Sequence, residues 1–234
     1  SFGTDVLFKE VNFSLNPGER VGLVGRNGHG KTTLLRLIIG EEQPDTGEIL
    51  FPRGYQVGYV QQHLSFTRRS LIEEACLGLP ECNKNDTWRA EKVLSGLGFS
   101  GTDMLRAPAA FSGGYQVRLN LAKVLLARPD LLLLDEPTNF LDVVAIRWLA
   151  NFLRQWPGEL LLVTHDRSFM DKVTTHTLGI HRKKIQKIAG TTGKYYQKLA
   201  LDEEVCEKTR RNEEKKRRET EIFISRFRAK ARLA

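Results

Sequence analysis

The sequence predicts an α/β fold in which a largely parallel sheet carries a phosphate-binding loop. The glycine-rich stretch Gly25–Thr32 follows the apolar run Arg20–Val24 and precedes a helical pattern at Thr33–Ile39. Two further runs, Leu131–Leu134 and Glu159–Val163, lack the polar alternation of half-exposed strands, as is typical of strands buried on both faces. Both runs end in polar residues, at the sheet edge where ligands of open α/β folds bind.

The loop fits the pattern G-x-x-x-x-G-K-[ST] without a gap. Its glycines let the backbone curl with its N–H groups pointing inward, around a polyphosphate. Lys31 places a charge on the β- and γ-phosphates, and the Thr32 hydroxyl can bind Mg²⁺. The start of the following helix adds a partial positive charge. The residues expected to hold a nucleotide here are Gly25, Asn27, Gly28, His29, Gly30, Lys31, Thr32 and Thr33.

Polar side chains at three strand ends complete a candidate catalytic set. Asp135 and Glu136 follow a buried run; the first can hold Mg²⁺ through water, and the second can orient or deprotonate an attacking water. Gln62 follows the strand expected at 56–60 and can reach the metal or the water, although surface glutamine pairs are common. His165 follows the last buried run and is a candidate γ-phosphate contact.

The N-terminal region and one insertion depart from the α/β rhythm. Alternating residues at Val6–Leu15 predict strands of an antiparallel sheet, with another strand at Glu48–Phe51. Residues 64–111 predict a small helical insertion, with helices from Ser70 to Leu79 and from Asp86 or Thr87 to Leu97. Its expected core residues are Trp88, Val93, Leu94 and Leu97.

Ser112-Gly113-Gly114 begins a helix that is predicted to run to about Ala127. The two glycines expose backbone N–H groups at a helix start, which suits a second anion site. A plain helix capped by Ser112 explains the same residues. Local physical chemistry leaves both interpretations open.

The C-terminal part predicts a hairpin and then one long helix. Strands at Thr177–Ile180 and Lys184–Ile188 flank a turn, and glycines at 190–193 mark a boundary. We therefore expect an ATP-binding domain at 1–190 and a charged helical linker at 191–234. The linker helix, Lys194 to about Ala231, contains acid-to-base pairs at i,i+4: Glu204–Lys208, Glu207–Arg211, Glu213–Arg217 and Glu214–Arg218.

The net charge of +8 is concentrated in the tail, because residues 1–180 sum to −1 and residues 181–234 to +9. This asymmetry favours an anionic partner, nucleic acid first, although a solvated helical spacer gives the same pattern. No apolar run is long enough to span a membrane. Three cysteines without metal or redox spacing indicate free thiols and a cytoplasmic location. The chain begins at Ser1 without a methionine, so we expect a fragment of a longer product.

In this order the motifs resemble the ATP-binding-cassette (ABC) family. The resemblance identifies Gly25–Thr32 as Walker A, Gln62 as the Q-loop and Ser112-Gly113-Gly114 as the ABC signature. It also identifies Leu131–Glu136 as Walker B with its catalytic glutamate, Asn139–Asp142 as the D-loop and His165 as the switch histidine. The resemblance implies ATP and Mg²⁺ as cofactors, with Mg²⁺ contacts from Thr32, Gln62 and Asp135. It also implies nucleotide contacts from the signature residues and Asp142, and stacking of Phe2 on the adenine ring.

The sequence motifs FSGGYQVRL, DEPTNFLD and THDRSFMD resemble those of the ABC-F group in particular. Its members have no membrane domains and are mostly translation or ribosome-protection factors. They pair two cassettes head to tail with ATP between them, and residues 226–231 resemble the end of the linker that reaches between ribosomal RNA and tRNA. The resemblance implies an ATPase half that acts on the ribosome beside a second cassette, in the same full-length chain or in a homodimer. A transporter's nucleotide-binding subunit or a DNA-binding ABC ATPase remains the alternative.

Overall fold

The computed structural model describes residues 6–60, 65–80 and 86–231, with side chains described up to residue 221. Its strands are β1 (Arg20–Gly25), β2 (Val57–Tyr59), β3 (Leu131–Asp135), β4 (Glu159–Val163), β5 (His176–His181) and β6 (Lys184–Ala189). Its helices are α1 (Lys31–Ile39), α2 (Leu71–Cys76), α3 (Thr87–Gly96), α4 (Gly113–Ala127), α5 (Val143–Arg154), α6 (Arg167–Val173) and α7 (Thr192–Ala231). The chain divides into two compact units, Ser1–Thr192 and Gly193–Ala234.

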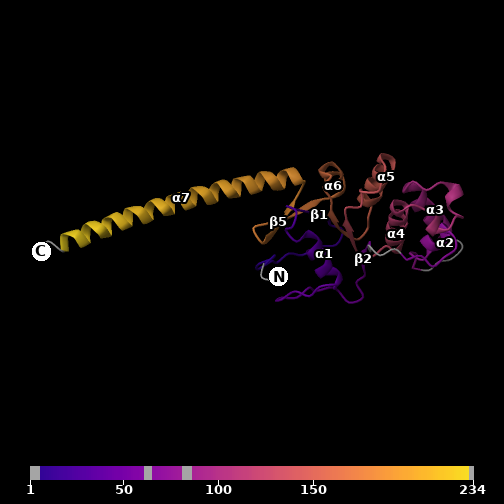
Figure 1. Cartoon of the computed structure of the whole chain (residues 1–234), viewed down its shortest axis with the longest axis horizontal. Coiled ribbons are helices and arrows are strands. Elements are labelled where there is room, and N and C mark those ends of the chain that lie inside the picture. Colours follow the sequence, from indigo (N-terminus) through magenta and orange to yellow (C-terminus); the bar gives the residue numbers. More distant parts are fainter. Residues whose placement is uncertain (1–5, 61–64, 81–85, 232–234) are drawn as a thin grey trace. The chain divides into compact units, whose positions relative to one another are not determined.

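One sheet organises the first unit, in the strand order β2-β3-β4-β1-β5-β6. Figure 1 labels three of these strands, β1, β2 and β5. All neighbours pair in parallel except β5 and β6, which form the predicted antiparallel hairpin. The apolar residues of β3 and β4 are completely or almost completely buried, as their sequence predicts. Because the central strands are parallel, the loops that follow β1, β3 and β4 meet at one edge of the sheet.

The strands predicted at Val6–Leu15 and Glu48–Phe51 are wrong. Neither stretch forms a strand in the described structure, and both run as irregular segments. Phe8 and Phe13 still pack against the buried core, whereas Leu50 is 78% exposed. The alternation thus reflects burial of one side of the segment, which does not require the hydrogen bonds of a β-ladder.

The predicted helical insertion is present, and α2, α3 and α4 lie together beside the β2 edge (Figure 1). Ser70 and Glu73 form the predicted capping box of α2, although the helix ends at Cys76 instead of Leu79. Buried Glu74 accepts hydrogen bonds from the backbone N–H groups of Thr67 and Arg68 and from Lys123 of α4. This carboxylate therefore fastens α2 and the segment before it to α4.

Trp88 does not belong to the core of the insertion. Val93, Leu94 and Leu97 are buried as predicted, but Trp88 is 56% exposed. At roughly 100° per residue, Trp88 lies about 140–240° around the helix from these three side chains. It therefore faces the opposite side of α3.

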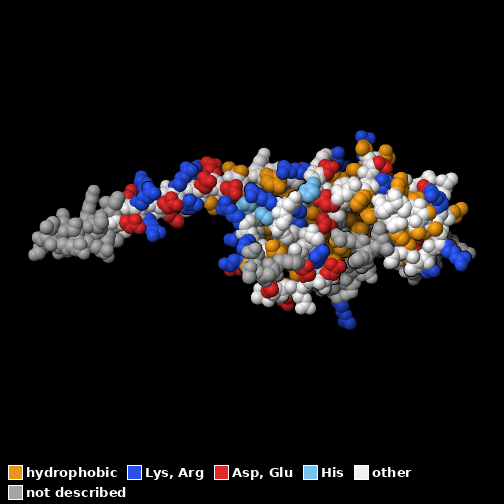
Figure 2. Space-filling view, in the orientation of Figure 1, with side chains coloured by type: hydrophobic (Ala, Val, Ile, Leu, Met, Phe, Trp, Pro, Cys, Tyr) orange, Lys and Arg blue, Asp and Glu red, His pale blue; other side chains and the backbone are white. Residues whose placement is uncertain are grey.

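The helix α7, taken by itself, is continuous over 40 residues and carries cations and carboxylates along its described length (Figure 2). The predicted pairs Glu204–Lys208 and Glu207–Arg211 form at 2.7 and 3.5 Å. The predicted pairs of Glu213 and Glu214 with Arg217 and Arg218 are wrong. Glu214 accepts from Arg210 at 3.1 Å, and Arg217 donates to Glu221 at 3.1 Å. Glu214 thus pairs with the arginine four residues before it, and Arg217 with the glutamate four residues after it. Within the described ranges, no helix is both long and apolar enough to cross a bilayer.

Candidate functional site

The loop between β1 and α1 has the backbone of a phosphate cradle. Gly28 and Gly30 adopt φ values of 77° and 87°, in the left-handed region that glycine tolerates best. At Gly30 an added Cβ would lie 2.9 Å from Cζ of Phe8. The ammonium group of Lys31 donates to the carbonyl oxygens of Gly25 at 2.9 Å and Arg26 at 3.3 Å. The lysine is thus held over the loop, at the position the motif requires for a phosphate contact.

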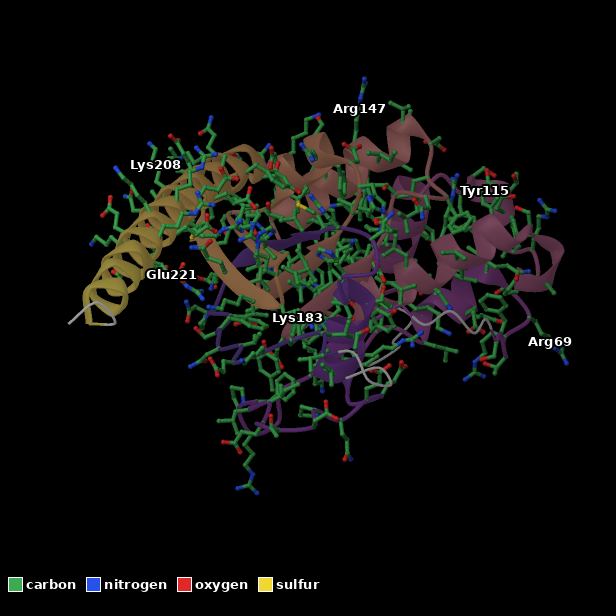
Figure 3. The ribbon with its side chains drawn as sticks, turned by 60° about the vertical axis from the view of Figure 1, so that its left-hand side comes forward. Arg69, Tyr115, Arg147, Lys183, Lys208 and Glu221 are labelled. Atoms are coloured by element: carbon green, nitrogen blue, oxygen red, sulfur yellow. The ribbon has the colours of Figure 1, made fainter. Side chains whose placement is uncertain are left out.

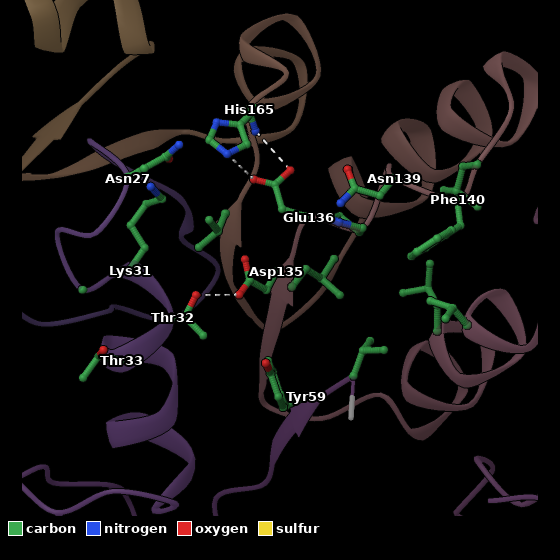
Figure 4. Close-up of a pocket in the computed structure, with 18 of the residues that line it drawn as sticks. Asn27, Lys31, Thr32, Thr33, Tyr59, Asp135, Glu136, Asn139, Phe140 and His165 are labelled. Atoms are coloured by element: carbon green, nitrogen blue, oxygen red, sulfur yellow. Dashed lines mark hydrogen bonds and ion pairs between the residues drawn. The ribbon is translucent and has the colours of Figure 1, made fainter. Parts of the chain in front are cut away.

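The end of β3 is joined to the start of α1 by one hydrogen bond. Thr32 Oγ1 donates to Asp135 Oδ2 at 3.1 Å (Figure 4). Asp135 is the last residue of β3 and lies opposite Val163 of β4 in the ladder. The two oxygen groups that the sequence assigns to Mg²⁺ are therefore adjacent.

Glu136 leaves the sheet in a strained conformation. Its φ is 50°, and its N–H donates to the carbonyl of Val163 at 2.9 Å. Left-handed backbone at a non-glycine residue costs about 1–3 kcal/mol and concentrates at functional sites. The carboxylate faces His165, whose backbone N–H donates to Oε2 at 3.2 Å and whose Nε2 lies 3.4 Å from Oε1 (Figure 4). Apart from this long contact, Oε1 is a buried acceptor without a hydrogen-bond partner among the described residues.

These groups line one pocket of about 930 Å³. Of the predicted site residues, it brings together Asn27, Gly28, Gly30, Lys31, Thr32, Thr33, Asp135, Glu136 and His165. Gly25 and His29 belong to the loop but do not line the pocket. Phe2 and Gln62, the predicted adenine and Q-loop contacts, lie outside the described residues.

The signature residues and Asp142 do not reach this pocket either. Ser112 occupies the predicted N-cap position of α4, but its side chain makes no capping hydrogen bond. The Asp142 carboxylate caps α5 by accepting from Ala145 N at 2.9 Å. This bond lowers the pKa of Asp142; burial opposes it, and the nearby Arg118 charge adds to the lowering. The nucleotide contacts of the signature residues and Asp142 stay predictions.

Sequence reasoning missed Arg118, the residue that connects α4 to the loop after β3. It is 9% exposed and donates to the carbonyls of Phe140 at 2.6 Å and Leu97 at 3.0 Å. Its guanidinium also stacks 4.5 Å from the Tyr115 ring and lies 3.4 Å from Asp142. An arginine in a helical pattern normally indicates a solvated face, and its acceptors come from distant segments, so no local signal was available.

Tyr59 was also missed, although it precedes the predicted Q-loop. Its ring lines the pocket near Asp135 (Figure 4). Burial raises the pKa of the Tyr59 hydroxyl, and the negative charge of Asp135 raises it further. The phenol therefore stays protonated and can serve the site as a neutral hydrogen-bond donor.

Two segments of the chain match known family patterns. Residues 8–139, more than half of it, match the family described as ABC transporter, and residues 178–234 match a second pattern with that description. The "Probable ATP-binding protein YheS" of Escherichia coli (strain K12) is 34% identical over 98% of this chain and 41% of its own length. "ATP-binding cassette sub-family F member 3" of Rattus norvegicus is 34% identical over 100% of this chain and 38% of its own length. The chain thus spans about two fifths of the length of these relatives.

Solved structures show the same fold. The cassette MJ0796, in a dimeric post-hydrolysis state bound to ADP and Pi, aligns with a TM-score of 0.65 and 21% identity over 78% of this chain and 90% of its own. An ATP-binding subunit of an ABC transporter aligns with a TM-score of 0.65 and 25% identity over 86% and 92%. On the family match and the site geometry together, the chain belongs to the ATP-binding-cassette family and, within it, to the ABC-F group.

Proposed function

We propose that this chain is an ATP-hydrolysing cassette that works with a second cassette, closing on ATP and opening after hydrolysis. The observation that carries the proposal is the convergence of two pairs at one sheet edge. Thr32 meets Asp135 there, and Glu136 meets His165. The first pair suits metal-bound phosphate, and the second suits an attacking water.

The loop would hold the phosphates of ATP. Its backbone amides and Lys31 are the donors, and the ammonium group now shared by two loop carbonyls would transfer to phosphate oxygens. This exchange replaces neutral acceptors with charged ones, which strengthens the hydrogen bonds. The start of α1 adds the partial positive charge of its N-terminus.

The residues present fit Mg²⁺. A threonine hydroxyl and a carboxylate are hard oxygen donors, and magnesium sites use one or two such protein groups together with water and substrate phosphates. Thr32 and Asp135 would hold the ion, and Gln62 is the third proposed contact. Bound Mg²⁺ supplies charge neutralisation at the phosphate oxygens.

Glu136 would act on the water. In the described part of the chain, its Oε1 is a buried acceptor without a hydrogen-bond partner, so a water placed there gains a bond and a route for its proton. His165 lies beside the carboxylate and would contact the γ-phosphate. Since the backbone N–H of His165 already fixes Oε2, the carboxylate is oriented before the substrate binds.

A second cassette would complete the site. Ser112, Gly113, Gly114 and Asp142 lie outside this chain's own pocket, and we assign them to the nucleotide held by the partner cassette. Phe140, Val143 and Val144 are 52–75% exposed beside the same loop, as residues covered by a partner would be. The dimeric state of MJ0796 supports pairing at the level of the fold.

The basic tail leads us to place this ATPase on the ribosome, in the cytoplasm. Residues 181–234 carry a net charge of +9, whereas the rest of the chain is near neutral. Described side chains along α7 from residue 206 onward are exposed, so its cations are available to RNA phosphates. Ribosomal RNA and tRNA are therefore the proposed partners.

The test is co-sedimentation of the full-length Glu136→Gln protein with ribosomes, with and without ATP, across a salt series. We expect ATP-dependent pelleting that weakens as salt rises, because phosphate contacts release counterions. Absence of pelleting at every salt concentration, with ATP binding intact, would exclude the ribosome as partner.

A transporter subunit is the second candidate, favoured by the likeness to an ATP-binding subunit of an ABC transporter. It predicts co-purification with a membrane protein and gives no role to α7. A DNA-binding ATPase is the third, and it predicts tighter binding to DNA than to ribosomal RNA or tRNA. Binding assays with the three nucleic acids, at matched salt, separate it from the first.

A further inference from the structure

All three tryptophans of the chain line one pocket that the nucleotide site does not use. Trp88 comes from α3, Trp148 from α5, and Trp156 from the segment after α5. The pocket has a volume of about 480 Å³, within the range of small-ligand sites. None of the residues that line the nucleotide pocket lines this one.

The aromatic rings form a rigid wall. Trp148 stacks on Phe152 with ring centroids 5.0 Å apart, and the tilted Trp156 ring lies 6.0 Å from that of Phe152. An added Cβ at Gly96 would lie 2.0 Å from the Trp148 ring, so the close approach of α3 fixes that ring in place. Trp156 is 4% exposed, and its indole N–H is a buried donor without a hydrogen-bond partner among the described residues.

Trp88 stands at the open side of the same pocket. More than half of its surface is exposed, although indole is normally among the more buried side chains. The Arg89 guanidinium lies 5.5 Å from its ring, a cation–π distance. An exposed indole beside a cation is a platform that a flat aromatic ligand can cover.

The charged side chains that line the described part of the pocket are all positive. The described lining residues include Arg89, Lys92 and Arg128 and no carboxylate. Arg89 lies 3.8 Å from the Asp86 carboxylate, which is outside the lining. Two amides also line the pocket: Asn151 of α5 and Gln155, the residue that directly follows this helix.

We propose that this pocket binds an unpaired nucleotide of a single-stranded nucleic acid. The base stacks on Trp88, the neighbouring phosphates meet Lys92 and Arg128, and the amides and the Trp156 N–H serve polar groups of the base or sugar. Aromatic platforms with basic surroundings are how proteins bind unpaired bases, and stacking tolerates any base. The described lining of the pocket contains no residue of α7 and would give the proposed ribosomal ATPase a second contact, between its helical insertion and α5.

The tryptophans supply the readout, because every indole in the chain lines this pocket. The full chain is titrated with hexauridine RNA while indole fluorescence is recorded, and binding is followed independently by anisotropy of a labelled copy. A hexathymidine DNA arm shows whether the sugar matters. We expect indole quenching that saturates with the anisotropy signal.

The variants are chosen in matched sets. Trp88→Ala should raise Kd by about 5- to 100-fold, and Trp88→Phe, which keeps a stacking ring, by less than about 3-fold. Lys92→Gln should lower the salt slope by about one unit, whereas Arg147→Gln should change neither value. Arg147 is an exposed cation of α5 that projects away from the neighbouring elements and does not line the pocket (Figure 3). Leu105→Ala, an 80% exposed apolar control, should bind as the parent does.

Binding seen by anisotropy without indole quenching, and with equal Kd for Trp88→Ala, would place the nucleotide elsewhere and overturn the inference. Lack of any binding would overturn it as well, and an acidic peptide that quenches the indoles where RNA does not would assign the pocket to a protein partner. ATP turnover and ATP-dependent pelleting are measured on the same variants. Failure of the pocket therefore remains distinguishable from failure of the proposed ATPase function.

Discussion

The Glu136 carboxylate contacts His165 through both of its oxygens. Oε2 accepts the backbone N–H of His165 at 3.2 Å, and Oε1 lies 3.4 Å from Nε2 of the ring. The contact joins the residue after β3 to a residue after β4. Because Glu136 also donates its N–H to Val163, three bonds or contacts hold a residue whose φ of 50° is unfavourable for glutamate.

We expect Glu136→Gln to retain ATP binding and to lower turnover by about 100-fold or more. The amide keeps the shape and an oxygen acceptor for His165 but cannot take a proton from water. Phosphate release and equilibrium binding of a fluorescent ATP analogue measure the two properties separately. Glu91→Gln, at an exposed position of α3, is the control. Phosphate release at the parent rate in Glu136→Gln would remove Glu136 from catalysis.

Arg118 gives a prediction about stability. Arg118→Met keeps an apolar stem against Tyr115 but leaves the carbonyls of Phe140 and Leu97 without their donor. An unsatisfied buried acceptor costs about 1–3 kcal/mol. Because the Leu97 bond is buried and the Phe140 bond only partly so, the free energy of unfolding should fall by about 2–4 kcal/mol. Urea denaturation measures this value. Exposed Arg147→Met should stay within about 0.5 kcal/mol of the parent. Equal losses in the two variants would contradict the role of Arg118.

The sequence predicted the residues whose chemistry depends on spacing along the chain. The loop from Gly25 to Thr32 works through adjacent backbone groups, so eight residues suffice to recognise it. The strands β3 and β4 were recognisable because a strand covered on both faces lacks polar alternation, and here the polar residues stand only at the strand ends, Asp135 and Glu159.

Features that depend on distant partners were not predictable. Arg118 is buried because carbonyls 21 and 22 residues away in the sequence accept from it. Phe8 and Phe13 pack on the core without joining the sheet, and alternation cannot distinguish the two situations. The exposure of Trp88 depends on its angle around α3, which an apolar composition alone does not reveal.

Glu19 predicts a dependence of stability on pH. Burial acts to raise its pKa, but hydrogen bonds from Lys187 and from Asn16 outweigh burial and lower it to about 2, against 4.5 ordinarily. A depressed folded-state pKa contributes stability above the unfolded value. That contribution of about 1–3 kcal/mol should be lost as pH falls from about 4.5 toward 2.

The measurement compares the parent with Glu19→Gln by urea denaturation at pH 7 and pH 3. The difference in unfolding free energy between the two proteins should shrink at pH 3. Glu91→Gln, which changes an exposed carboxylate of α3, should show no such trend. A difference that is constant over this range would refute the assignment of the acid sensitivity to Glu19.

Gly30 should be the least replaceable glycine of the phosphate loop. Gly30→Ala places a side chain at φ 87° and 2.9 Å from the Phe8 ring. Left-handed backbone alone costs alanine about 1–2 kcal/mol. We therefore expect the unfolding free energy to fall by at least that amount and ATP binding to weaken, because a shift of the loop moves its N–H donors.

Two companions separate the causes. Gly101→Ala, where an added Cβ meets nothing within 4 Å, should leave both properties unchanged. Adding Phe8→Leu to Gly30→Ala removes the ring contact but keeps the backbone strain. If the double variant recovers ATP affinity, contact with Phe8 is the dominant effect; if it does not, the left-handed backbone is. Parent-like stability and affinity in Gly30→Ala would contradict the cradle geometry itself.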